Sequence, residues 1–419
     1  MRRDATATYR GFDDFYGYYL ACNADYWYHT VANGAAACTT DHVYNASVQD
    51  WSDSVGTRLS PGDRVARNGT YNQELLTARA EAIIAAHDAS APLYMYLAYQ
   101  NVHEGCARPD KLGMQAPLAS VALYNTTKLD TYKLMGAMIT ELDAGVGRVE
   151  AALRAAGLWE ETLVVFVSDN GGPLEHATNA PLRGGKHTFW DGGLRVEAFL
   201  AGGALPAAAR GATWDGLAHA SDLYLTLVEG FAGVAVDPTQ TGGPRPLDGF
   251  NLYPAIVAGA PSPRSEIIHQ VNNTYFDEGA SAIRVGDMKL IRGPAGDNRT
   301  LAWPEREAKA VPLGKTGAVV EAGTDHVRAP VLPGAVLHTC APYCLFNITA
   351  DPGETKDLRI GGGAEVAALA AALIARLDAA GATGPPHAYI WANASAFQAA
   401  VRASCEASLQ SGSTQPVDF

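Results

Sequence analysis

The chain has 419 residues, of which 47% are hydrophobic and 18% are charged. This composition supplies enough apolar side chains for a folded core and too few charges for a disordered chain. Lys and Arg number 31 against 44 Asp and Glu, a net charge of −13, which argues against nucleic-acid binding because that function needs a basic surface. No apolar run approaches the roughly 18 residues of a membrane span.

Helical patterns alternate with apolar runs in the first half of the chain. Residues 71–87 and 127–156 carry apolar side chains at helical spacing. Residues 93–99 form an apolar run typical of a buried parallel strand, and a β-branched run over 164–168 predicts another. A further strand is predicted over 194–200. This alternation predicts an α/β domain with a mostly parallel sheet flanked by helices.

Turn-rich segments before residue 265 predict a boundary between two domains, residues 1–258 and 263–419. The second, smaller domain is predicted to be α+β with an antiparallel sheet. Its expected strands are 267–271, 282–285, 288–291 and 343–348, with Gly286 and Asp287 as a two-residue turn, and its expected helix is 364–377.

A possible site follows the run at 164–168, where the sequence continues as Asp169, Asn170 and two glycines. Ligands of open α/β sheets bind beyond the carboxyl ends of the strands. Asp169 and Asn170 offer a carboxylate and an amide oxygen, which suit calcium. Lys186, in a glycine-rich segment, can neutralise an anionic oxygen. Together they predict a site for a tetrahedral oxyanion ester, although the same residues also favour a simple turn.

His103 follows the apolar run at 93–99 and is therefore expected at the same rim of the sheet as Asp169. An imidazole there can donate a proton near neutral pH. A lone histidine is also common as an ordinary polar residue, and the residues alone leave both interpretations open.

Three segments carry a resemblance to a known family: 169–172 (Asp-Asn-Gly-Gly), 182–186 (Leu-Arg-Gly-Gly-Lys) and 191–195 (Asp-Gly-Gly-Leu-Arg). They resemble the sulfatase family of the alkaline phosphatase superfamily, most closely its arylsulfatase B (N-acetylgalactosamine-4-sulfatase) branch. The likeness extends along nearly the whole chain, into the segments at 10–18, 219–222 and 345–358.

The resemblance implies a sulfatase fold and metal-assisted hydrolysis of a sulfate ester, plausibly on a sulfated sugar. It implies that Asp169 and Asn170 hold calcium and that Lys186 and His103 bind the sulfate. It further implies that His103 is a candidate proton donor to the leaving oxygen and that Asp169 assists proton transfer at the nucleophile.

The nucleophile of the family is not in this chain. Sulfatases use a formylglycine made from the Cys or Ser of a Cys/Ser-x-Pro-x-Arg motif. The two segments with proline at the right spacing, 90–94 and 340–344, both lack the arginine. In the family this motif and a pair of metal-binding aspartates lie upstream of the position of Arg10. We therefore expect that the chain lacks its true beginning, that the formylglycine belongs to the missing segment, and that this chain alone is inactive.

Cysteines and asparagines predict the compartment. Seven of the fifteen asparagines begin N-x-Ser/Thr sequons, where chance would give about one or two. These are Asn45, Asn68, Asn125, Asn272, Asn298, Asn347 and Asn393. Six cysteines fit an oxidising compartment, and Cys340 with Cys344 predicts a local disulfide. We therefore expect a lysosomal or secreted glycoprotein, although residues 1–6 are polar and no signal peptide follows.

Two alternative functions are compatible with these motifs. One is a phosphodiesterase of the alkaline phosphatase superfamily, which is disfavoured because no histidine-rich pair accompanies Asp169 and Asn170. The other is a non-catalytic protein that binds sulfated glycans. The sequence does not indicate an oligomeric state.

Overall fold

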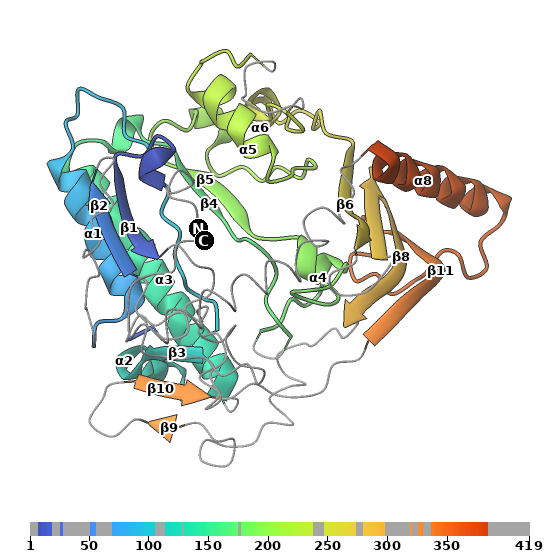
Figure 1. Cartoon of the computed structure of the whole chain (residues 1–419), viewed down its shortest axis with the longest axis horizontal. Helices are drawn as coiled ribbons and strands as arrows, with labels where there is room; N and C mark the ends of the chain where they lie inside the picture. Colours follow the sequence, from blue (N-terminus) through green and yellow to red (C-terminus); the bar gives the residue numbers. More distant parts are fainter. Residues whose placement is uncertain are drawn as a thin grey trace, which may run out of the picture.

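The structure is a computed structural model that describes residues 7–18, 26–27, 51–55, 69–104, 114–127, 130–174, 177–237, 247–273, 280–297, 319–320, 326–329 and 337–383. Two long helices lie at one side of the molecule, a two-stranded sheet lies in the middle, and a four-stranded sheet with one helix lies at the other side (Figure 1). None of the described helices is both long enough and apolar enough to cross a membrane.

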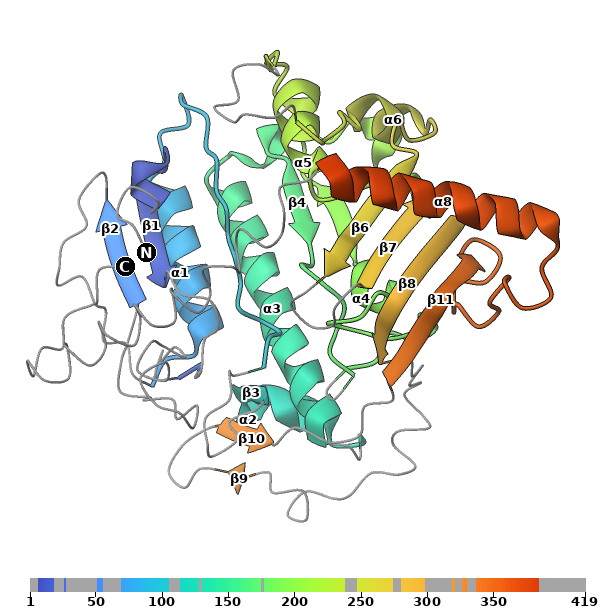
Figure 2. The ribbon, with the colours of Figure 1, turned by 45° about the vertical axis from the view of Figure 1, so that its right-hand side comes forward.

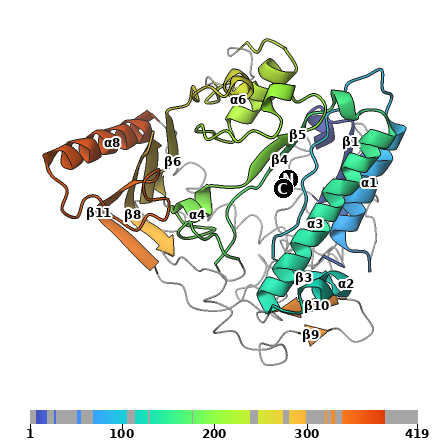
Figure 3. The ribbon, with the colours of Figure 1, turned by 180° about the vertical axis from the view of Figure 1, so that it is seen from behind.

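The two helices predicted in the first half are confirmed as α1 (Asn72–Ala86) and α3 (Asp130–Ala155), which pack side by side (Figure 3). One face of α3 is buried in a core formed by the side chains of Leu134, Met135, Ala137 and Met138 with those of Tyr26, Trp27, Tyr71, Met114 and Ala116. Gly157 follows the helix in a left-handed conformation, with φ of 73°, which is a common way for a helix to end.

The segment predicted as a strand over 93–99 is not one. Residues 92–100 run without regular secondary structure, and Tyr94 and Tyr96 are 69% and 74% exposed. The segment reaches α1 at its end, where the hydroxyl groups of Tyr99 and Thr77 lie 3.0 Å apart. A strand is defined by its backbone pairing, and no described strand pairs with this segment.

The strands on either side of the candidate site are β4 (Val164–Val167) and β5 (Ala198–Ala201). The first is predicted correctly, whereas the second begins at residue 198 instead of 194 because α4 (Asp191–Leu194) forms in its place. The two strands pair antiparallel, with Val164 opposite Ala201. The ladders between described strands are all antiparallel, so the predicted parallel pairing is not formed within the described residues.

The sheet near the C-terminus agrees with the predicted antiparallel strands. It contains β6 (Glu266–Asn273), β7 (Ala280–Val285), β8 (Met288–Asp297) and β11 (Leu337–Asn347), in the order β11-β8-β7-β6. Helix α8 (Ala364–Thr383) lies along this sheet (Figure 2), with Leu373 and Leu377 packed on Ile283, Leu290 and Leu345. The division into two domains at residues 258–263 stays a prediction.

The remaining elements are short and connect these parts. They are β1 (Asp14–Tyr18), β2 (Trp51–Val55), β3 (Met114–Pro117), α2 (Leu118–Val121), α5 (Asp222–Leu225), α6 (Tyr253–Ala258), β9 (Val319–Val320) and β10 (His326–Ala329), with a π-helical segment at Thr226–Phe231 and 3-10 turns at Ala7–Tyr9, Ala122–Tyr124, Trp159–Glu161 and Ala207–Ala209.

The loop that carries Lys186 packs on the face of the C-terminal sheet opposite to α8. Trp190 of this loop is fully buried against a cluster of sheet residues, namely Ala282, Ile291, Ala295, Cys340, Cys344, Phe346 and Ile348. Cys340 and Cys344 form the predicted disulfide, with their Cα atoms 5.0 Å apart. The sheet therefore supports the candidate site through apolar packing.

Two leucines of α8 test this account of the C-terminal core. Leu377 is 0% exposed and Leu369 is 37% exposed. Replacing Leu377 by Ala should lower the free energy of unfolding by about 2–5 kcal/mol, because it removes packed methyl groups and leaves a cavity. The same change at Leu369 should cost less than about 1 kcal/mol. Urea unfolding of both variants measures the difference, and equal losses would contradict the packing described.

Candidate active site

Lys186 and His103, which are 83 residues apart in the chain, meet in the structure. The Lys186 Nζ atom lies 2.9 Å from His103 Nε2. Lys186 lies in the loop between β4 and α4, and His103 lies just after the extended segment 92–100. Both side chains are half-buried. An ammonium group can only donate hydrogen bonds, so Nε2 is the acceptor of this contact.

The His103 ring is oriented by a second contact. Its Nδ1 atom lies 2.5 Å from the backbone carbonyl oxygen of Glu104. Since Nε2 accepts from Lys186, the hydrogen-bond network assigns the neutral ring proton to Nδ1, which donates to that carbonyl. The backbone around the ring is held by the Tyr26 hydroxyl group, which lies 2.7 Å from the His103 carbonyl oxygen, and by the Asn101 amide, which donates to the Met138 carbonyl of α3 at 2.8 Å.

Asp169 and Asn170 follow β4 after one residue, Ser168, close to the predicted end of the strand. Asp169 Oδ1 accepts a hydrogen bond from the Asn170 backbone N–H at 2.8 Å, and the Asn170 Nδ2 group donates to the Gly171 carbonyl at 3.0 Å. Among the described residues, no basic side chain pairs with Asp169, which is exposed. Asp169 Oδ2 and Asn170 Oδ1 are therefore uncommitted hard oxygens, which is the donor set that suits calcium.

The loop of Asp169 and the loop of Lys186 are joined through their backbones. The Lys186 N–H donates to the Gly172 carbonyl at 3.2 Å, and the Gly171 N–H donates to the Gly193 carbonyl at 3.1 Å. A Cβ atom at Gly171 would come within 1.8 Å of the Gly192 oxygen, so only glycine allows this approach.

Asn179 completes the joint between the two loops. Its Oδ1 accepts from the Gly172 N–H at 2.9 Å, and its Nδ2 donates to the carbonyls of Gly172 at 2.8 Å and Gly184 at 3.0 Å. The structure thus brings Lys186 and His103 into contact and ties the backbone of Asp169 and Asn170 to the Lys186 loop. The side chains of Asp169 and Asn170 form hydrogen bonds only with their immediate neighbours among the described residues.

Comparison with known proteins identifies the family of this chain. A family model described as Sulfatase matches residues 1–234, more than half of the sequence. The chain belongs to the sulfatase family. This membership confirms the predicted family, whereas the closer likeness to its arylsulfatase B branch stays a prediction.

Individual sulfatases extend this result. Arylsulfatase J from Mus musculus is 31% identical over 373 residues, which cover 85% of this chain and 54% of the relative. Arylsulfatase A from Homo sapiens is 32% identical over 271 residues, which cover 60% of this chain and 45% of the relative. The chain therefore spans about half the length of these curated relatives.

Two solved structures show the fold. The structure of Ps i-CgsB in complex with k-i-k-neocarrahexaose has a TM-score of 0.59 and 22% identity, and the match covers 90% of this chain and 67% of that one. PsFucS1 sulfatase from Pseudoalteromonas sp. has a TM-score of 0.52 and 22% identity, over 84% and 62% of the two chains. These matches confirm the predicted α/β sulfatase fold with its C-terminal antiparallel sheet.

Asn179 and Arg183 contact the loops of the candidate site and were not predicted from the sequence. Asn179 carries no recognisable motif, and its role depends on contacts with glycine backbones. Arg183 lies in the segment that resembles the family, but only the structure shows that its guanidinium lies 4.0 Å from the centre of the Trp190 ring and donates to the Glu354 carbonyl at 2.7 Å. Burial lowers the pKa of Arg183, and the nearby carboxylates of Glu354 and Asp351 oppose this effect.

The three hydrogen bonds of Asn179 give a direct test of the joint between the loops. The change Asn179→Asp keeps the acceptor for Gly172 but replaces both donated bonds by repulsion between oxygens. It should lower the free energy of unfolding by about 1–3 kcal/mol, because it removes the donor to the Gly172 and Gly184 carbonyls and places a charged oxygen beside them. Urea unfolding measures the loss.

A matched control is Asn251→Asp. Asn251 Oδ1 accepts from the Tyr253 N–H at 3.0 Å, and aspartate keeps that bond, so little change is expected there. If the two variants lost the same stability, Asn179 would have no special part in joining the loops.

Proposed function

We propose that this chain carries the sulfate-binding part of a sulfuric ester hydrolase. The observation that supports this most strongly is the contact between Lys186 and His103, at 2.9 Å, beside the loop of Asp169 and Asn170. Membership of the sulfatase family supports the reaction class. Because the chain spans about half of the curated relatives it matches, the proposal concerns the activity of the whole protein.

Lys186 supplies positive charge to the substrate. A sulfate ester carries a negative charge, and more negative charge develops on the departing oxygen as the bond to sulfur breaks. An ammonium group held in a half-buried loop stabilises this charge more than one in open water. Among the described residues no carboxylate forms an ion pair with Lys186, so its charge is available to an anion.

His103 is proposed to bind the sulfate and to donate a proton to the leaving oxygen. In the described arrangement its Nε2 atom faces Lys186, and its Nδ1 atom is held by the Glu104 carbonyl. The ring edge that carries Nε2 is therefore the part of His103 proposed to contact the substrate. To act as general acid for the leaving group, Nε2 must carry a proton, and Lys186 then donates to the sulfate in place of Nε2.

Asp169 and Asn170 are proposed to hold a calcium ion. Their uncommitted oxygens fit as part of a coordination shell that needs six to eight oxygens, so other ligands are required. When bound, the ion would polarise the sulfate and favour a deprotonated nucleophile. Asp169 is also proposed to assist proton transfer at that nucleophile.

The nucleophile is proposed to be a formylglycine outside these 419 residues, since no Cys/Ser-x-Pro-x-Arg motif occurs in them.

A sulfated sugar is the proposed substrate, supported by relatives that include the N-acetylgalactosamine-6-sulfatase of Mus musculus, 26% identical over 304 residues. The seven sequons, with Asn125 exposed, and the Cys340–Cys344 disulfide support a lysosomal or secreted glycoprotein.

The role of Lys186 is testable in this chain and in a longer protein. Titration calorimetry with sodium sulfate and calcium should detect binding to the 419-residue chain. The change Lys186→Ala should weaken this binding at least about tenfold, because it removes a charge-assisted hydrogen bond. Lys356→Ala, which removes the same charge from an exposed position, is the control and should leave the binding constant unchanged.

The activity test begins with the transcript upstream of the codon for Met1. If it encodes Cys/Ser-x-Pro-x-Arg, the longer protein should hydrolyse p-nitrophenyl sulfate, the 419-residue chain should not, and Lys186→Ala should lower kcat by about 10²–10³. A longer protein that keeps full activity after Lys186→Ala would remove Lys186 from the site. A longer protein without the motif that binds sulfated glycans would instead support the non-catalytic alternative.

A further inference from the structure

A fully buried lysine of the C-terminal sheet lies behind the loop of Lys186. Lys289 on β8 is 0% exposed. Its Nζ atom lies 2.6 Å from Asp191 Oδ1 and 2.8 Å from Glu354 Oε1. Glu354 is also 0% exposed, and its Oε2 accepts from the Asp191 backbone N–H at 2.7 Å. Three charged side chains therefore form one ion cluster away from water.

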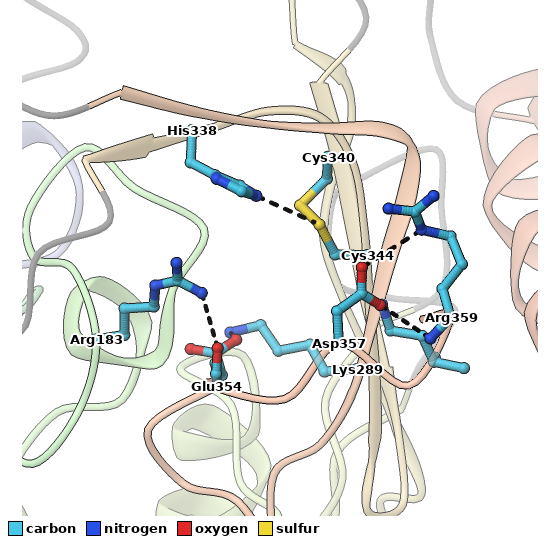
Figure 4. The surroundings of a disulfide bond; sticks show 9 residues. Arg183, Lys289, His338, Cys340, Cys344, Glu354, Asp357 and Arg359 are labelled. Atoms are coloured by element: carbon cyan, nitrogen blue, oxygen red, sulfur yellow. Dashed lines mark hydrogen bonds and ion pairs between the residues drawn. A yellow bond between two sulfur atoms is a disulfide. The ribbon is translucent and has the colours of Figure 1, made fainter. Parts of the chain in front are cut away.

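The cluster holds both ends of the loop that carries Lys186. Asp191 begins α4, five residues after Lys186, and Arg183 lies three residues before it. The Arg183 guanidinium donates to the Glu354 carbonyl at 2.7 Å (Figure 4). Since Glu354 also accepts from the Asp191 N–H, it contacts both ends of the loop. Between these ends, the Phe189 N–H donates to the Ala295 carbonyl of β8 at 3.0 Å.

Stability alone does not account for such a cluster. Replacing a buried ion group by well-packed apolar residues is often neutral or stabilising, because taking charges out of water is costly. The ion pairs instead fix the positions of side chains. Lys289 holds the two carboxylates in place, and Asp191 in turn holds the start of α4. The Lys186 ammonium and His103 can bind the same sulfate only if the loop holds the ammonium beside the His103 ring.

We infer that Lys289 is a positioning residue for the sulfate site: through Asp191 and Glu354 it fixes the loop of residues 183–193 so that Lys186 is presented beside His103. The C-terminal sheet, which carries Lys289 on β8, then helps to position the anion site. This inference rests on the proposed role of Lys186. It assigns no contact between Lys289 and the substrate.

The test compares Lys289→Met with Arg292→Met in the whole chain. Arg292 lies on the same strand but pairs with Asp378 at 2.9 Å near the surface, where the two side chains are 31% and 57% exposed. Hydrogen exchange by mass spectrometry should show residues 183–193 exchanging about tenfold faster in Lys289→Met, while β4 and β5 exchange as in the parent. Sulfate affinity should fall about tenfold, because fewer molecules hold the binding-competent loop. Arg292→Met should change neither measurement.

A second variant covers the case in which Lys289→Met does not fold. Glu354→Gln keeps an acceptor for the Asp191 N–H and removes one charge from the cluster, so it should show the same local pattern in a milder form. A folded Lys289→Met, or failing that a folded Glu354→Gln, that keeps the parent exchange in residues 183–193 would overturn the inference. So would faster exchange spread evenly over the chain, since a merely structural role predicts that result.

The same data separate this inference from the proposed function. If Lys186→Ala leaves sulfate binding unchanged, the role of Lys186 fails, and the exchange of residues 183–193 shows independently whether Lys289 holds the loop. If Lys186→Ala abolishes binding while Lys289→Met leaves both affinity and exchange as in the parent, only the positioning role fails.

Discussion

Two glycine-rich loops touch backbone to backbone, and the candidate site depends on that contact. The carbonyl oxygen of Gly192 occupies the place that a Cβ atom of Gly171 would take, at 1.8 Å. Across the same contact, the Gly171 N–H donates to the Gly193 carbonyl, and the Gly172 carbonyl accepts from the Lys186 N–H. Because no side chain separates the loops, the segment of Asp169 and Asn170 lies against the segment of Lys186. Any larger residue at position 171 would force the two apart.

The charge of the site differs from the charge of the chain. The chain carries a net charge of −13, so its overall field repels a sulfate ester. Lys186, however, faces the His103 ring and has no carboxylate partner among the described residues. A locally positive site in an acidic protein attracts its substrate only at short range. The carboxylates that lie behind the loop, Asp191 and Glu354, are neutralised in part by Lys289.

Sequence patterns predicted the helices and the strand that depend mainly on the spacing and type of neighbouring residues. Helical spacing located α1 and α3, and the β-branched run located β4. The strand predicted over 93–99 failed because an apolar run becomes a strand only with a partner, and none of the described strands supplies one. The start of β5 was misplaced because Asp191–Leu194 forms the short helix α4, and Asp191 at its start contacts Glu354 and Lys289.

In the candidate site, too, residues close together in the sequence were predicted, whereas contacts between distant residues were not. Asp169, Asn170 and Lys186 were predicted because glycines, hard oxygens and an ammonium follow one another closely in the sequence, and their roles stay a prediction. His103 was found by resemblance, and the 2.9 Å contact with Lys186 supports the choice. The cluster behind the loop was not predictable, since Lys289 lies 98 residues and Glu354 lies 163 residues from Asp191. No local spacing rule connects positions so distant in the chain.

A crystal structure of the chain grown with calcium and sodium sulfate tests the central claim most directly. One cation is expected at about 2.3–2.6 Å from oxygens of both Asp169 and Asn170. A sulfate is also expected, with oxygens about 3 Å from Lys186 Nζ and His103 Nε2. A sulfate bound away from these two nitrogens, or a cation bound away from Asp169 and Asn170, would contradict it.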